Sequence, residues 1–386
     1  MTLATQIQAI VVGWQIYALT HDPLALGLIG LAEVLPFVGF ALYAGHVADA
    51  SDRRRVSLAS LVVLLGCGIA LLSMTRAHGF LATHGPWPVY AVIVTSGVAR
   101  SFLQPSRNAM AAELVPRELY PNAIAWRSSS WQTAAVGGPA LGGLLYGFAN
   151  AEIAYVVVVA LMIVGVAAFL AIRYVPLPRT LHAGPMLESL VSGVRFVLAS
   201  PVLLGALMLD LFSVFLAGSE ALLPIFAAEI LRVGPQGLGV LRAAPAVGAV
   251  LTSVWLAHRP PLERAGRDML LAVGVFALCI IGFGMSRSFV LSLGLLALSG
   301  MADNVSVVIR STLLQTLTPP DMLGRVSSVN QIFIGSSNEL GAFESGVAAR
   351  YLGTVRAVVI GGIASLGVVG TIASRVPALR RLERLV

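Results

Sequence analysis

The sequence predicts an all-α polytopic membrane protein of twelve transmembrane helices, arranged as two pseudo-symmetric bundles of six. Composition is the first reason: of 386 residues, 57% are hydrophobic and 11% are charged, which is too apolar for a water-soluble domain of this length. The second reason is a series of long apolar runs. The third is a repeat that relates the first half of the chain to the second.

About 20 apolar residues are needed for a helix to cross the hydrocarbon core. Twelve segments of the chain meet this requirement: 2–19, 24–47, 56–75, 88–106, 121–147, 153–174, 201–226, 237–257, 269–286, 289–309, 326–348 and 354–374. The first run is short and has no basic residues before it, so we expect either a chain clipped at its N-terminus or a shallow first helix.

A charged turn between the second and third runs sets the orientation. It reads Gly-His-Val-Ala-Asp-Ala-Ser-Asp-Arg-Arg-Arg from Gly45 to Arg55, and such an arginine cluster is retained on the cytoplasmic side. With the turn and both termini in the cytoplasm, the cytoplasmic segments hold 17 arginines, Arg310 included, and the opposite loops hold five.

The net charge of +7 therefore reports topology and does not predict a nucleic-acid partner. Both cysteines, Cys67 and Cys279, lie inside apolar runs, where they suggest neither a disulfide nor a metal site. The sequence shows no paired histidines, nucleophile elbow or phosphate loop. We expect no cofactor, no metal and no enzymatic activity.

The repeat appears at two offsets. At 209 positions, Gly30, Glu33 and Pro36 correspond to Gly239, Arg242 and Pro245. At 203 positions the following residues correspond: Gly97 to Gly300, Arg100 to Asp303, Arg107 to Arg310, Gly138 to Gly341, and Gly143 to Gly346. Repeated halves of this kind are common in transporters.

The repeat predicts a bundle at 1–174 and a second at 201–386, separated by a cytoplasmic linker at 175–200. The linker begins with three prolines, Pro176, Pro178 and Pro185, which exclude a membrane span. It continues as an amphipathic helix over 186–199, expected to lie at the membrane surface.

Ionisable groups inside membrane spans are costly and are therefore functional candidates. Arg100 carries the most weight, and Gln104 and Arg107 follow it on the same helical face. The remaining candidates in the spans are Glu33, Asp210, Glu220, Arg242, Asp303, Glu339 and Glu344. The alternative is that Glu33, Arg100, Arg242 and Asp303 neutralise one another in fixed ion pairs.

Two motifs resemble signatures of the major facilitator superfamily. Its pattern Gly-x-Leu-Ala-Asp-Arg-x-Gly-Arg-Arg is matched here by Gly45, Ala48, Asp49, Arg53 and Arg54, while Val47, Ala50 and Asp52 depart from it. The resemblance implies that the turn is a conformational-switch loop in which Asp49 braces the cytoplasmic closure.

The second motif is Gly138-Pro139-Ala140-Leu141-Gly142-Gly143, which resembles the Gly-Pro-x-x-Gly-Gly signature of proton antiporters that export drug-like compounds. A helix-packing seam of small residues is the alternative explanation. We expect Gly142 and Gly143 to lie where the fifth span packs against the eighth.

The chain further resembles the transmembrane secretion effector branch of the superfamily, the enterobactin-exporter-like group. The residues that show this are 12–20 with 23–27, 105–109, 114–118, 310–315, 324–327 and 337–341. Within the superfamily, an arginine in the fourth span is linked to proton coupling, which implies this role for Arg100.

The resemblance implies a secondary active transporter that works by rocker-switch alternating access. We expect proton-coupled efflux of a small amphiphilic or siderophore-like compound by a monomer in the bacterial inner membrane. Arg100 and Asp303 are the expected proton-sensitive pair, with Glu33 and Asp210 next. An importer or facilitator, or a non-transporting membrane scaffold, is the alternative.

Overall fold

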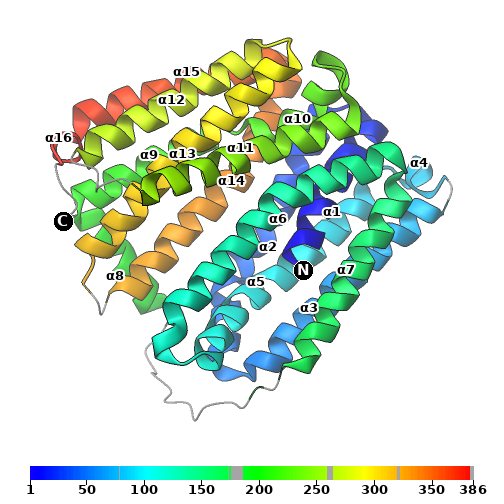
Figure 1. Ribbon diagram of the computed structural model, residues 1–386, viewed down its shortest axis with the longest axis horizontal. Helices are drawn as coiled ribbons and strands as arrows, with labels where there is room; N and C mark the ends of the chain where they lie inside the picture. Colours follow the sequence, from blue (N-terminus) through cyan, green and yellow to red (C-terminus); the bar gives the residue numbers. More distant parts are fainter. Residues whose placement is uncertain (78, 173, 175–185, 259–263, 320–321, 383–386) are drawn as a thin grey trace. The chain divides into compact units, whose positions relative to one another are not determined.

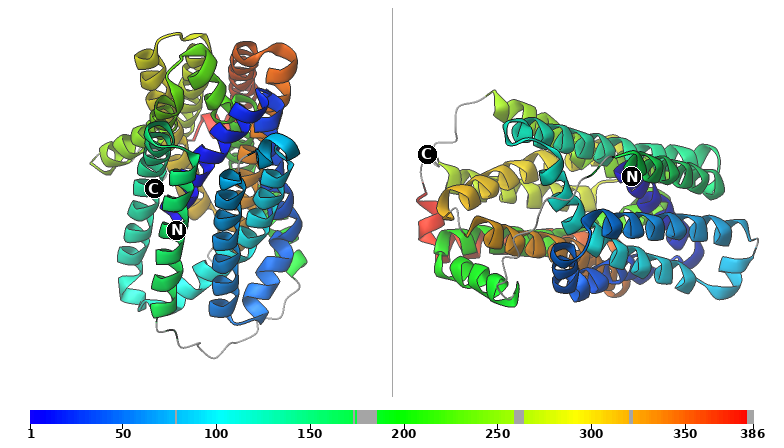
Figure 2. Two further views of the ribbon diagram at one scale, coloured as in Figure 1. Left: turned by 90° about the vertical axis from the view of Figure 1, so that its right-hand side faces the viewer. Right: turned by 90° about the horizontal axis from the view of Figure 1, so that it is seen from below.

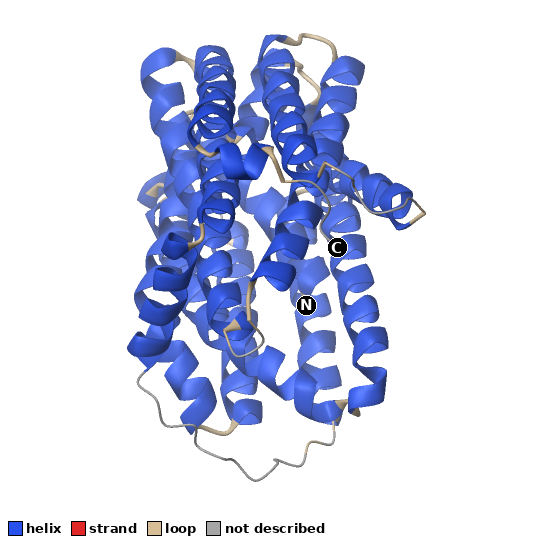
Figure 3. Cartoon of the chain, turned by 90° about the vertical axis from the view of Figure 1, so that its left-hand side faces the viewer, coloured by secondary structure: helices blue, strands red, loops and turns tan. Residues whose placement is uncertain are grey.

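The computed structural model describes residues 1–77, 79–172, 174, 186–258, 264–319 and 322–382. The prolines of the predicted linker lie outside these residues. The surroundings of some residues within helices are also outside the description, among them those of Gly45 and Asp49. Every regular element of the described chain is helical (Figure 3). The predicted all-α fold class is confirmed.

Among the described residues before the linker, the structure has seven α-helices and one 3-10 turn. They are α1 (Thr2–Thr20), α2 (Pro23–Ala50), α3 (Arg53–Arg76), α4 (Phe80–His84), α5 (Trp87–Leu114), η1 (Arg117–Leu119), α6 (Tyr120–Phe148) and α7 (Ala151–Ala171). The six predicted spans of this half lie on α1, α2, α3, α5, α6 and α7, and α5 continues eight residues beyond the predicted end at 106.

The second half begins with the predicted amphipathic helix, α8 (Met186–Ala199). The seventh span is interrupted, because α9 ends before Gly218 and a 3-10 turn, a short α-helix and a short π-helix follow. The elements are α9 (Pro201–Ala217), η2 (Ser219–Leu222), α10 (Leu223–Ile225), η3 (Phe226–Ile230), α11 (Gly234–Ala257), α12 (Ala265–Met285), α13 (Phe289–Leu317), α14 (Leu323–Leu352), α15 (Thr354–Arg375) and α16 (Pro377–Arg380).

Eight of the long helical stretches are apolar enough along their length to cross a membrane, counting only described residues. They lie on α2, α3, α7, α9 to η3, α11, α12, α13 and α15. The other four predicted spans, on α1, α5, α6 and α14, carry more polar residues, and their membrane crossing stays a prediction.

Polar residues in the short turns fix where several helices begin. Asp52 accepts hydrogen bonds from the backbone N–H groups of Arg54 (2.9 Å) and Arg55 (3.3 Å) at the start of α3. Asp22 caps α2 and Asn150 caps α7 in the same way. Such caps satisfy N–H groups that have no partner within the helix.

The chain forms two compact units. Unit 1 is Met1–Ala183 with Val233–Ala243, and unit 2 is Gly184–Arg232 with Ala244–Val386. Within unit 1, α2 packs on α5, α3 on α7 and α1 on α6; within unit 2, α12 packs on α15 and α9 on α14 (Figures 1 and 2). The first turns of α11 therefore belong to unit 1, although the sequence repeat assigns them to the second half.

A glycine and a proline make the same contact in both units. In unit 1 a Cβ atom added at Gly97 on α5 would lie 2.6 Å from Cγ of Pro36 on α2. In unit 2 a Cβ atom at Gly300 on α13 would overlap the backbone of Pro245 on α11. These four residues are matched by the repeat, so the correspondence read from the sequence extends to the packing.

The glycines of the α6 motif approach two different helices. Gly142 packs against Ile7 and Ile10 of α1, whereas a Cβ atom at Gly143 would lie 2.5 Å from the carbonyl oxygen of Pro235 and 2.8 Å from Cα of Gly239 on α11. The expectation that both glycines pack on the eighth span is correct for Gly143. It is wrong for Gly142, because one residue of rotation turns it by about 100° around the helix.

We predict that Gly143→Leu destabilises unit 1 by about 1–3 kcal/mol, since the added side chain has no space against the α11 backbone. Cys67 and Cys279 are buried, so their reaction with a thiol-reactive dye during heating reports unfolding. The control is Gly137→Leu, because no atom lies within 4 Å of a Cβ atom added there. Equal unfolding temperatures for the two variants would show that the α6–α11 contact is not tight.

Candidate functional site

An ion pair joins α2 and α5 in unit 1. Arg100 Nη2 lies 2.8 Å from Glu33 Oε1, and the two side chains are 38% and 26% exposed. The pair sits beside the contact of Gly97 with Pro36, which brings the two helices together. The single hydroxyl proton of Ser101 lies within hydrogen-bonding distance of two carbonyl oxygens, that of Gly97 on its own helix (3.0 Å) and that of Pro36 across the junction on α2 (3.3 Å). The charged groups are therefore held by a close helix contact.

Within unit 1, Arg100 pairs with Glu33. The expected partner Asp303 lies on α13 in unit 2, and its pairing with Arg100 stays a prediction. A fixed pair involving Glu33 was the alternative, but with Arg100 and Arg242 both as possible partners. What the sequence did not reveal is that Gly97 and Pro36 bring the α2 and α5 turns bearing Glu33 and Arg100 together.

A second ion pair lies inside unit 2, between Asp210 on α9 and Arg310 on α13. Its side chains are only 9% and 5% exposed, and leaving either charge without the other in this environment would be costly. Arg310 was expected in a cytoplasmic segment after the tenth span. The structure shows that α13 continues to Leu317 and that Arg310 is buried in unit 2, and its cytoplasmic placement stays a prediction.

The remaining candidates in the spans are placed separately. Asp303 is half-buried on α13, and its neighbour Asn304 donates a hydrogen bond to Ser253 Oγ of α11 (3.0 Å). Gln104 is exposed on α5, where its Oε1 accepts a hydrogen bond from Arg107 (3.1 Å). Among the described residues, no group of three or more His, Cys, Asp or Glu side chains is arranged to hold a metal ion.

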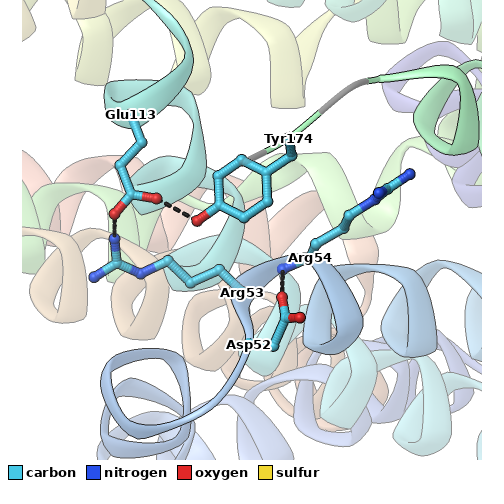
Figure 4. A network of polar contacts seen from close by, with 5 residues as sticks. All are labelled: Asp52, Arg53, Arg54, Glu113 and Tyr174. Carbon is cyan, nitrogen blue, oxygen red and sulfur yellow. Dashed lines mark hydrogen bonds and ion pairs between the residues drawn. The ribbon is translucent and has the colours of Figure 1, made fainter. Parts of the chain in front are cut away.

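A polar network surrounds the turn between α2 and α3 (Figure 4). Arg53 forms an ion pair with Glu113 near the end of α5, and the hydroxyl of Tyr174 donates to the other oxygen of that carboxylate. Arg54 donates to the carbonyl oxygen of Leu170 near the end of α7 (3.0 Å). The turn is thus tied to the ends of two other helices.

Sequence reasoning identified Arg53 and Arg54 but missed Glu113 and Tyr174. The signal for Glu113 was available, since it is a carboxylate that follows the predicted fourth span, in a segment that the sequence predicts to lie on the same side as the arginine-rich turn. Tyr174 carried no such signal, because it directly precedes the linker. Gly45 and Asp49 fall in the last turns of α2, and the surroundings of both residues lie outside the description.

Comparison with known proteins extends over nearly the whole chain. The sequence profile of transmembrane secretion effectors matches residues 1–385. Enterobactin exporter EntS of Shigella dysenteriae serotype 1 is 30% identical over 319 residues, which are 82% of this chain and 74% of that protein. Its counterpart in Escherichia coli O1:K1 is 30% identical over 320 residues, with the same coverage.

A solved structure shows the same fold at lower identity. A bacterial homologue of the iron transporter ferroportin, in an inward-facing state, is 17% identical and superposes with a TM-score of 0.68 over 97% of this chain and 98% of that one. The profile match and the 30% identity together establish the relationship. The chain belongs to the transmembrane secretion effector family and is a transporter of the major facilitator superfamily.

Proposed function

We propose that this chain is a proton-coupled exporter of a small amphiphilic or siderophore-like compound, working by rocker-switch alternating access. The observation that carries the proposal is the Glu33–Arg100 pair, which lies between two long helices and is still partly exposed. Charged groups within membrane helices face the bundle interior or a water-filled path. A pair of this kind suits the wall of a transport pathway.

Glu33 is the preferred proton acceptor in this proposal. A guanidinium group stays charged at physiological pH, so Arg100 cannot itself release the proton. Protonation of Glu33 would instead remove the attraction between the two side chains, which couples proton binding to the contact of α2 with α5. Asp303 remains the second candidate. Asp210 is third, because its buried pair with Arg310 offers little access to water.

Export is the proposed direction because the relatives at 30% identity are named as exporters. The arginine distribution supports an inner-membrane protein with both termini in the cytoplasm. We propose a monomer, with protons and a small molecule as its partners. An importer or facilitator, and a scaffold that does not transport, are the competing functions.

The network around Arg53 gives the proposed switch a physical basis. The turn after α2 is held to the end of α5 through Glu113 and to the chain after α7 through Tyr174. If one half of the transporter rocks as a rigid body, the ends of its helices must stay together while its contacts with the other half change. We therefore propose that Arg53, Arg54 and Glu113 keep this end of unit 1 rigid during the switch, and that Asp49 braces its closure.

The central test measures accumulation of a compound panel that includes enterobactin, in cells with and without the protein. Export predicts lower accumulation when the protein is present, and a protonophore should abolish the difference because it removes the proton gradient. Higher accumulation with the protein would favour the importer. No difference for any compound would favour the scaffold.

We predict that Glu33→Gln abolishes proton-driven accumulation of enterobactin in reconstituted vesicles and leaves downhill exchange measurable, because glutamine keeps the shape but cannot carry the proton. Glu152→Gln is the matched control, since Glu152 pairs with Arg76 at helix ends (2.7 Å). If Glu33→Gln still transports protons with substrate, Asp303→Asn becomes the next variant to test.

We predict that Glu113→Gln slows transport without changing substrate affinity. The loss of charge removes the ion pair with Arg53 that holds the α2–α3 turn, and it leaves the Glu33–Arg100 pair intact. Asp49→Asn should act in the same way. The measurements are initial transport rates and binding in detergent, with Glu118→Gln, an exposed carboxylate of η1, as control. A normal rate in well-expressed Glu113→Gln and Asp49→Asn would remove the switch assignment.

A further inference from the structure

Two arginines of unit 1 meet at a single turn of α5. Arg107 lies on that turn and donates a hydrogen bond to Gln104 Oε1 (3.1 Å). Arg127 reaches across from α6 and donates to Oδ1 of Asn108, the residue next to Arg107 (3.1 Å). Two guanidinium groups are therefore held against neighbouring residues of one helix by neutral amide side chains.

Neither arginine pairs with a carboxylate within the part of the chain that the structure describes. Both side chains are exposed, and their positive charges repel each other. Each guanidinium carries five N–H donors. The hydrogen bond to the amide oxygen uses one donor of each arginine. Donors and charge remain available for an anionic group, which arginine binds through short, charge-assisted hydrogen bonds.

The pseudo-symmetric positions in unit 2 show that the fold does not require this arrangement. Arg107 corresponds to Arg310, whose charge is neutralised by Asp210 in the interior. At the same offset Arg127 corresponds to Asn330, which carries no charge. The second half keeps one arginine and pairs it with an acid, whereas the first half has two arginines that form no ion pair with a carboxylate among the described residues. The pair is a specific property of unit 1.

An exposed aromatic residue accompanies the arginines. Trp131 follows Arg127 by four residues, which places both on one face of α6, and its side chain is 54% exposed. An indole ring next to a guanidinium group offers an apolar surface beside a cation. This combination fits a molecule that has an anionic group attached to an aromatic or other flat apolar body.

We propose that Arg107 and Arg127, supported by Asn108 and Gln104 and flanked by Trp131, form a binding site for the anionic group of an organic amphiphile. The role of this site as a substrate site rests on the proposed export function. If that function is correct, the exported compound is an anion. Carboxylates, phosphates and ionised phenols share the required chemistry. Binding to the site is measurable without transport.

The test measures binding of two fluorescent dyes, anionic fluorescein and cationic ethidium, to the full chain in neutral detergent by fluorescence anisotropy. Fluorescein should bind, and added salt should weaken it. The double variant Arg107→Gln/Arg127→Gln should weaken fluorescein binding by about tenfold or more, the effect expected for losing charge-assisted bonds, and should leave ethidium within twofold. Arg356→Gln, an exposed arginine on α15, is the control.

Arg127→Lys keeps the charge and serves as a second variant should the double variant fold poorly. It should retain more fluorescein affinity than Arg127→Gln. Benzoate should displace the dye at lower concentration than acetate, and Trp131→Ala should remove that difference. Unchanged fluorescein affinity in the double variant, or an equal loss for ethidium, would overturn the proposal.

Anionic lipid headgroups could bind to the same site as an anionic substrate. A competition experiment distinguishes these two ligands. Phosphatidylglycerol added to the micelles should displace fluorescein no better than phosphatidylcholine. Selective displacement by phosphatidylglycerol would reassign the site to lipid and overturn the substrate role. Protonophore-sensitive export without fluorescein binding would reject this site alone. Arginine-dependent binding without any transport would reject the proposed function and leave the anion site standing.

Discussion

Neutralising charge within tightly packed apolar helices is the constraint on which this structure depends. Glu33 and Arg100 meet between α2 and α5, and Asp210 and Arg310 meet between α9 and α13. The two pairs differ in access to solvent. The pair in unit 2 is buried between its two helices, whereas the pair in unit 1 is partly exposed, so the same kind of ion pair occurs in two environments in one chain.

The fold followed from the sequence because its signals are local and repeated. Apolar runs determined the long helices, and the offsets of 203 and 209 anticipated the recurring contact of Gly97 with Pro36 and of Gly300 with Pro245. Pairing of side chains was harder. Hydropathy predicted an end of the tenth span at 309 and could not show that the helix continues to Leu317, and the pairing of Arg100 with Glu33 depends on helix rotation.

Most residues of the candidate site could be predicted from the sequence, but only some of the contacts between their side chains could. Intramembrane charge identified Glu33 and Arg100, and the superfamily motif identified Arg53 and Arg54. The link from Arg53 through Glu113 to Tyr174 joins positions about 60 residues apart along the chain. No spacing rule covers such a link, because it depends on three helix ends meeting in space.

The glycine–proline contact that recurs in both units also has an evolutionary consequence. A contact kept in both copies fits an origin by duplication of a half-length protein, whose two copies would have had to pair in the membrane before fusion. In such a homodimer every substitution appears twice. Such a homodimer could not carry the unequal residues now found at Arg107 and Arg310, or at Arg127 and Asn330, because each pair would have been one position of one gene.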